Sequence, residues 1–225
     1  MARKSPAVKR SPDSEEDSVA AQTMADILAI ATEEFALKGL AGARVDEIAE
    51  RTRTSKRMIY YYFGGKEELY RAVLTKVYAD IRTREEQLKL SELSPVEAMR
   101  RLVELTFDYD ETHVPFIRLV MSENIHRARH LGKLPGLKQI SASVKKSLGE
   151  IVRRGVADGV FRSSVDPIDL HLFISAFCFF RVSNQHTLKV IFGPELLDTA
   201  ARKRHKAMIV EAAFNMLGVS ANDRA

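Results

Sequence analysis

Residues 45–69 read VDEIAERTRTSKRMIYYYFGGKEEL, and this stretch decides the fold of the 225-residue chain. Asp46 and Glu47 are placed as the acidic residues of the first turn of a short helix. Ser55 is a good N-cap for a second short helix, which runs to the glycine pair at 64–65. About four residues separate the two helices, which is the spacing of a helix-turn-helix.

The second of these helices carries an unusual set of side chains. Between Arg51 and Lys66 the chain has five basic residues and no carboxylate. Cations and hydroxyl-bearing aromatics suit a groove lined by phosphates and base edges, whereas a catalytic pocket would need a titratable acid or base. Lys66 begins the next helix, where backbone N–H groups also favour a phosphate. The predicted DNA-binding residues are Ser55, Lys56, Arg57, Tyr60, Tyr61, Tyr62 and Lys66.

Packing is the alternative role for part of this helix. Three adjacent tyrosines, at 60–62, together cover about 300° of a helix, so at least one of them must face inward. The buried positions that the pattern predicts are Ile48, Ala49, Ile59 and Phe63.

At these residues the chain resembles the TetR family of bacterial repressors. The match comprises FALKG at 35–39, VDEIA at 45–49 and SKRMIYYYFGGKEEL at 55–69, of which the last run is the most specific. The remaining chain fits the family in length and helical character. The resemblance implies an N-terminal three-helix DNA-binding domain, a helical ligand-binding and dimerisation domain, and no enzymatic activity.

The resemblance also assigns individual residues, with two departures. It implies that Tyr60 and Tyr62 face the DNA and that Tyr61 is the more packed of the three. Arg53 stands in place of the family's turn glycine, so we expect a strained or differently shaped turn. Arg44 stands where a threonine often caps the first short helix, which removes a cap and adds a cation to the predicted DNA-binding residues.

Composition narrows the class of protein. The chain is 45% apolar and 29% charged, which is ordinary for a soluble globular protein, and its net charge of +5 suits an anionic partner such as nucleic acid. A lone cysteine, Cys178, forms no internal disulfide, and no Cys/His cluster has zinc-finger spacing. The most apolar stretch, 170–182, is too short to span a membrane. These features predict a cytoplasmic protein without a cofactor, a metal or a membrane partner.

Helical periodicity from residue 22 onward predicts an all-α fold of about nine helices, with Gly39 closing the first. Residues 1–20 read as a disordered arm, either a solvated tail or a basic arm that reaches a DNA groove. Residues 21–67 would form the helix-turn-helix domain, and residues 68–218 a helical effector-binding and dimerisation domain.

A helix that is apolar on all sides is predicted over residues 166–186. One face of it must meet its own core and another a partner, although a central helix of a monomer is the alternative. The family resemblance implies a four-helix bundle formed with residues 138–157 of both copies. The predicted dimer-interface residues are Val144, Leu148, Phe173, Phe177 and Phe180.

A pocket between helices is the default ligand site in such a domain. We predict a mainly apolar or aromatic effector with one or two polar groups, and ordinary core packing is the alternative for each residue of the pocket. The predicted effector-binding residues are Phe107, His113, Phe116, Met121, Asn124, Phe177 and Cys178.

Two further clusters have competing interpretations. Glu123, His126 and His130 can share a helix face at metal-ligand spacing, but a di-iron site needs a second such motif, which we do not find. Residues 202–206, RKRHK, read as an exposed stretch of the last helix, with an anion-binding patch as the alternative.

The function that the sequence favours is that of a sequence-specific transcription repressor. It would bind double-stranded operator DNA as a homodimer and respond to a small-molecule effector. A helical metal or redox enzyme and a DNA-binding dimer without a ligand are the two alternatives.

Overall fold

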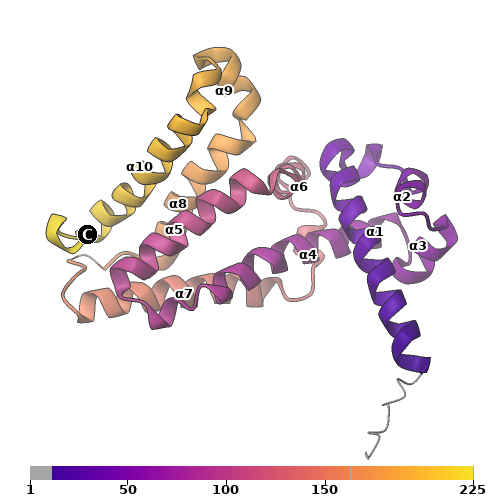
Figure 1. The fold of residues 1–225 in the computed structure, drawn as a ribbon, viewed down its shortest axis with the longest axis horizontal. Helices are drawn as coiled ribbons and strands as arrows, with labels where there is room; N and C mark the ends of the chain where they lie inside the picture. Colours follow the sequence, from indigo (N-terminus) through magenta and orange to yellow (C-terminus); the bar gives the residue numbers. More distant parts are fainter. Residues whose placement is uncertain (1–11, 163, 225) are drawn as a thin grey trace, which may run out of the picture. The chain divides into compact units, whose positions relative to one another are not determined.

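The computed structural model describes residues 12–162 and 164–224, and all of their regular structure is helical (Figure 1). These residues form ten α-helices and four short 3-10 helices, so the all-α class is confirmed and the count of about nine was one too low. The chain divides into two compact units, unit 1 (Met1–Val73) and unit 2 (Leu74–Ala225). The division falls inside α4 (Lys66–Gln87), the long helix that the sequence predicted.

Unit 1 contains α1 (Pro12–Gly42), α2 (Val45–Arg51), α3 (Lys56–Phe63) and the first turns of α4. Apolar residues at three- and four-residue steps give each helix one buried face. Phe35 and Tyr70 pack edge to face, with ring centroids 5.1 Å apart, which joins α1 to α4. The other fully buried residues of this core include Ile27, Ala31, Ile48, Ile59 and Leu69.

The ends of α1 differ in part from the prediction. Residues 1–11 of the predicted arm lie outside the described residues, but residues 12–20 are helical rather than disordered. A proline at the first helical position followed by acidic residues in the first turn favours a helix start there. Gly39 does interrupt the helix, because its backbone adopts φ 67° and ψ 173°, a conformation that favours glycine.

Unit 2 holds six complete α-helices after the end of α4, and prolines start three of them. Ser94 and Asp166 cap α5 and α8 by accepting backbone N–H groups of Glu97 (3.3 Å) and Ile168 (2.7 Å). The elements are α5 (Pro95–Thr112), α6 (Val114–Ile125), α7 (Leu137–Ala157), α8 (Pro167–Ser183), α9 (Gln185–Phe192) and α10 (Thr199–Leu217), with 3-10 helices η1 (Leu90–Glu92), η2 (Leu131–Lys133), η3 (Pro194–Leu197) and η4 (Ala221–Arg224).

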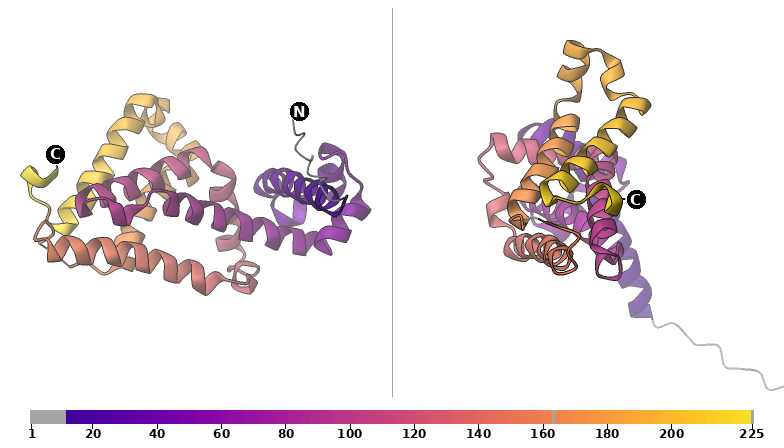
Figure 2. Two further views of the ribbon diagram at one scale, coloured as in Figure 1. Left: turned by 60° about the horizontal axis from the view of Figure 1, so that its bottom comes forward. Right: turned by 90° about the vertical axis from the view of Figure 1, so that its left-hand side faces the viewer.

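The core of unit 2 surrounds α5, which packs against α7, α8 and α10. In the views of Figure 2, α8 and α10 lie side by side, and α9 joins their far ends. Gly155 lets the ring of Phe161 approach α7, because a Cβ at this position would lie 2.1 Å from that ring. Buried core residues include Leu102, Val103, Phe107, Ile151, Leu170, Ile174 and Phe214.

The predicted dimer-interface residues do not share one face. Val144 and Leu148 are buried in the core of their own chain, at 9% and 3% exposure. They pack there because α7 turns its apolar stripe toward α5 and α8, and their part in a dimer interface remains a prediction. Phe177 is half-buried against the ring of His205, whereas Phe173 and Phe180 are exposed.

Candidate nucleic-acid interface

The turn between α2 and α3 has the four-residue length that the sequence predicted, since α2 ends at Arg51 and α3 begins at Lys56. Arg53 adopts φ 53°, the left-handed conformation for which the family uses glycine. Its backbone N–H still donates to the carbonyl of Glu50 at 3.2 Å. The expected strain is therefore confirmed, at a cost of about 1 kcal/mol, and the turn keeps its hydrogen bonds.

The two caps also follow the sequence. The Ser55 hydroxyl accepts the backbone N–H of Met58 at 3.1 Å and so starts α3. Arg44 occupies the N-cap of α2 without a side-chain cap bond. Instead, its own backbone N–H donates to the carboxylate of Glu34 at 3.2 Å, and Glu34 is 4% exposed. A buried carboxylate of α1 thus fixes the start of α2.

The outer face of α3 carries the exposed side chains. Ile59 is fully buried, while Lys56 and Arg57 are exposed. Tyr61 is 78% exposed and Tyr62 is half-buried, which contradicts the expectation that Tyr61 is the packed residue. At about 100° per residue Tyr61 lies opposite Ile59, whereas Tyr62 lies only about 60° from it.

Two further predictions about α3 have different outcomes. Tyr60 is 39% exposed, as a DNA-facing residue would be. Phe63 is half-buried rather than buried, because it stands in the last turn of the short helix. The face available to a partner is therefore formed by Lys56, Arg57, Tyr60 and Tyr61, and we call it the α3 face.

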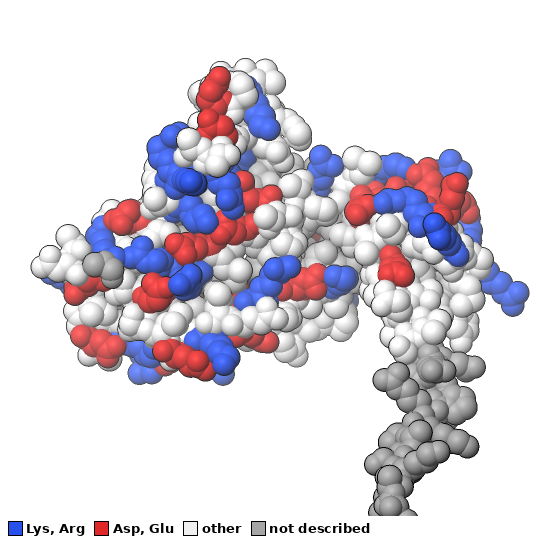
Figure 3. Space-filling view, in the orientation of Figure 1, with Lys and Arg blue, Asp and Glu red and all other residues white. Residues whose placement is uncertain are grey.

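Ion pairs leave part of the positive charge on the α3 face uncompensated. Lys56 Nζ lies 3.1 Å from the Asp46 carboxylate of α2. The guanidinium of Arg57 has no hydrogen bond or ion pair with the rest of the described chain. Arg51, outside this face, pairs with Glu33. Figure 3 shows Lys and Arg interspersed with Asp and Glu over the surface visible in this view.

Lys66 has a partner in the free chain. Its ammonium donates to the carbonyl of Ala41 at 3.2 Å, which ties the start of α4 to the end of α1. A phosphate contact for Lys66 remains a prediction.

The predicted effector-binding residues of unit 2 differ in their burial and contacts. Phe107 and Cys178 are buried at 1% each, and burial raises the pKa of the Cys178 thiol. His113 stacks on Tyr109 with ring centroids 3.9 Å apart. The buried members pack in the core of unit 2, and an effector-binding role for the set remains a prediction. Of the others, Phe116 and Met121 are half-buried and Asn124 is exposed.

The carboxylate of Glu123 serves the loop that follows α6. Its Oε2 atom accepts the backbone N–H groups of His130 and Leu131 at 3.0 and 2.8 Å. Within the part of the chain that the structure describes, no three His, Cys, Asp or Glu residues gather as a metal site. No described helix is long and apolar enough to cross a membrane.

Sequence reasoning missed the acidic partners of the RKRHK stretch. Arg202 and Lys206 both pair with Asp108 of α5, the second at 2.7 Å. The stretch is therefore partly neutralised, with Arg202, His205 and Lys206 half-buried and Lys203 and Arg204 exposed. Arg181 of α8, which is 5% exposed, pairs with Glu111 and donates from Nε to His205 Nδ1 at 3.0 Å. Pairs so distant along the chain leave no periodic signal.

A three-helix unit with a four-residue turn and an exposed cationic α3 defines a helix-turn-helix DNA-binding protein. Residues 27–73 match the model for bacterial regulatory proteins of the tetR family, and residues 95–213 match the Tetracyclin repressor-like C-terminal domain. The chain belongs to the TetR family of DNA-binding transcription regulators, which are not enzymes.

Relatives and solved structures agree with this assignment. The chain is 33% identical over 196 residues to the HTH-type transcriptional repressor NicS of Pseudomonas putida, covering 87% of this chain and 92% of the relative. It is 28% identical to the repressor SCO4008 of Streptomyces coelicolor, over 76% and 84% of the two chains. The transcriptional regulator SCO4942 of the same organism superposes with a TM-score of 0.65 at 25% identity, covering 88% and 99%.

Proposed function

We propose that this regulator is a repressor that binds operator DNA as a homodimer through its α3 face and responds to a small-molecule effector. The unpaired, exposed guanidinium of Arg57 carries the proposal, because such a group can donate to a guanine edge or a phosphate without breaking an internal contact. The relatives NicS and SCO4008 are repressors, which supports repression over activation.

Operator binding is the test of this proposal. The chromosomal sites that the protein occupies are mapped first, and a bound fragment then serves for anisotropy titrations over a range of salt concentrations. Arg57→Ala should cost roughly 1–3 kcal/mol and relax specificity at one base position. Lys66→Ala should weaken binding to all sequences alike and lower the salt slope by about 1.

Lys145→Ala provides the matched control, because Lys145 is an exposed lysine outside the α3 face. It should bind operator as the wild type does. Wild-type affinity in both Arg57→Ala and Lys66→Ala would show that the α3 face is not the DNA-binding surface.

The homodimer is supported by an exposed apolar face in unit 2. Leu172, Phe173 and Phe180 project from the same side of α8, at 60%, 37% and 56% exposure. Met208 of α10, the neighbouring helix, is 47% exposed. Solvent-exposed apolar side chains grouped in this way are typical of a protein–protein interface.

Phe180→Asp should yield a monomer by light scattering and lose operator binding, because it puts an unpaired carboxylate into an apolar contact. Ile125→Asp is the control, since Ile125 of α6 is a 75% exposed apolar residue outside this face. If both Phe173→Asp and Phe180→Asp remained dimeric, this face of α8 would not be the dimer interface. A two-fold dimer also predicts a pseudo-palindromic operator, which footprinting would show.

A further inference from the structure

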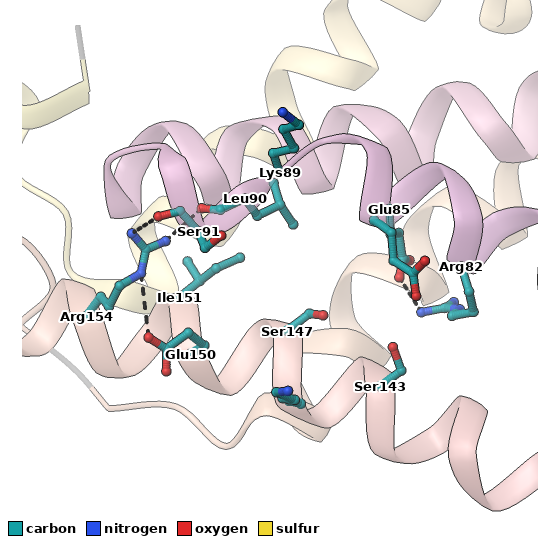
Figure 4. Close-up of a pocket in the computed structure, with 12 residues that line it drawn as sticks. Arg82, Glu85, Lys89, Leu90, Ser91, Ser143, Ser147, Glu150, Ile151 and Arg154 are labelled. Atoms are coloured by element: carbon teal, nitrogen blue, oxygen red, sulfur yellow. Dashed lines mark hydrogen bonds and ion pairs between the residues drawn. The ribbon is translucent and has the colours of Figure 1, made fainter.

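A groove of about 340 Å³ separates the C-terminal part of α4 from α7 in unit 2 (Figure 4). The chemical character of its lining changes along the groove. Leu90 and Ile151 form an apolar section, and Arg82, Ser143 and Ser147 form a polar section toward the other end. The groove therefore offers both an apolar surface and a polar anchor to one small molecule.

The polar section continues inward. A narrow space of about 10 Å³, which is about the size of one water, shares Arg82, Glu85 and Ser147 with the groove. It leads to Thr106 of α5 and His171 of α8. The polar section of the groove therefore adjoins a small internal space next to the core.

Arg154 holds the apolar end in place. Its guanidinium donates to the backbone carbonyls of Leu90 and Leu93, both at 2.8 Å, and so ties α7 to the segment between α4 and α5. These bonds join residues that are more than sixty positions apart in the sequence. A site with a fixed end binds at a smaller entropic cost than one that must be ordered by its ligand.

Hydrogen-bond donors outnumber free carboxylates in the polar section. Arg82 Nη1 donates to Glu85 at 2.5 Å, so the carboxylate there is already engaged. Arg82 Nε is buried and has no hydrogen-bond partner in the structure. Ser143 and Ser147 are half-buried, one helical turn apart, and their hydroxyls bond to no other described residue. These three donors line the polar section, where the carboxylate of Glu85 is engaged and that of Glu86 is exposed to solvent.

The remaining charges do not reverse this balance. Burial lowers the pKa of His171, and the nearby charge of Arg82 lowers it further, so this imidazole is neutral at pH 7. Glu150 is held by Arg153 at 2.7 Å. Glu86 and Lys146 line the exposed rim, where solvent screens them.

We propose that this groove binds a small organic acid, whose carboxylate accepts from Arg82 and the hydroxyls of Ser143 and Ser147 while its apolar body covers Leu90 and Ile151. A charge-assisted pair with a guanidinium supplies both affinity and orientation. This inference names the chemical class of the effector, so it rests on the proposed ligand response. Its site differs from the pocket around Phe107 and Phe177 that the sequence predicted. A carboxylate can reach Arg82 Nε only if α4 and α7 shift slightly apart, which gives ligand binding a means to alter α4.

The probe is benzoate, with benzamide as its neutral counterpart of the same shape. Calorimetry and thermal melting of the full-length protein should show binding and stabilisation by benzoate and at least ~tenfold weaker binding of benzamide, the loss expected for one charge-assisted hydrogen bond. Equal affinity for both, or binding of neither, would overturn the proposal.

Variants locate the site. Arg82→Gln combined with Glu85→Gln removes the pair without leaving one charge buried, and it should lower benzoate affinity at least ~tenfold. Ser147→Ala should lower it less. The matched control is Glu97→Gln combined with Arg101→Gln, which removes an exposed ion pair of α5 at 2.7 Å and should leave affinity unchanged. Wild-type affinity in the Arg82/Glu85 variant would place benzoate elsewhere and refute the site.

The failure of this inference can be told apart from that of the proposed function. Operator binding without any benzoate binding would refute the groove and leave DNA recognition intact. Binding of benzoate that leaves operator affinity unchanged would keep the site but refute its role in regulation, because linkage requires each ligand to alter the affinity of the other.

Discussion

Units 1 and 2 differ in how their buried polar side chains are hydrogen-bonded and paired. In unit 1, one oxygen of the buried Glu34 carboxylate is paired with Lys38 at 3.0 Å and also accepts the backbone N–H of Arg44. In unit 2, Asp110 is 5% exposed, and its carboxylate has no hydrogen bond or ion pair with another described residue. Arg181 has a buried Nη2 atom without a hydrogen-bond partner. A buried polar side chain that is paired holds one geometry. A buried polar side chain that lacks partners lowers the stability of the folded state and is typical of functional regions.

The difference matches the tasks of the two units. Unit 1 must present α3 in one orientation, and its paired carboxylate serves that rigidity. Unit 2 tolerates donors and acceptors that a ligand or a shift in packing can satisfy. Four substitutions test the contrast, in order of decreasing expected effect.

Glu111→Ala should destabilise unit 2 by about 3–5 kcal/mol, because it leaves the guanidinium of Arg181 buried without its counter-ion. Urea unfolding measures the change. Asp108→Ala is the control, since Asp108 is a more exposed carboxylate of the same helix. Equal effects of the two substitutions would show that burial of Arg181 carries no special cost.

Asp110→Asn should stabilise the protein by roughly 4 kcal/mol at pH 8. Burial raises the pKa of Asp110 from 3.8 to about 7, so the folded state retains a proton that the unfolded chain releases. The wild-type free energy of unfolding is therefore highest, as far as Asp110 is concerned, below pH 4. It falls as the pH rises to about 7, because the buried carboxyl must then ionise. Unfolding at pH 4 and pH 8 tests this, and a gain that is the same at both values would contradict it.

Glu34→Gln should destabilise unit 1 by about 1–2 kcal/mol, because a neutral amide binds Lys38 and the Arg44 N–H more weakly. The loss should appear as a lower unfolding midpoint together with weaker operator binding, since the start of α2 is released. Glu33→Gln, on the exposed side of α1, is the control. Stability unchanged by Glu34→Gln would remove the contrast between the units.

Arg53→Gly should have the smallest effect, a gain of up to about 1 kcal/mol, because glycine adopts the positive φ of this turn without strain. Thermal melting measures it. Arg53→Ala keeps the strain and lacks the charge, so it separates backbone from electrostatic effects on operator binding. A lower melting temperature in Arg53→Gly would show that the left-handed backbone is not strained.

Local signals determined much of unit 1 in advance. The cap at Ser55 and the four-residue turn follow from short-range sequence rules, the expected strain at Arg53 came from the family resemblance, and all three are present in the structure. The family resemblance was correct for the fold but wrong for Tyr61. Helix geometry alone, at 100° per residue from Ile59, would have placed Tyr61 on the outside.

The sequence by itself determined the all-α class, the helix-turn-helix and the starts of most helices, because caps, prolines and apolar periodicity act within a few residues. Only the tertiary structure decided which apolar residues of α7 and α8 face the core of their own chain, Val144 and Leu148 among them. It also brought Arg82 opposite Ser147 and Arg181 against Glu111, residues far apart in the chain. Such pairs depend on how helices cross, and side-chain packing across the whole unit sets those crossings.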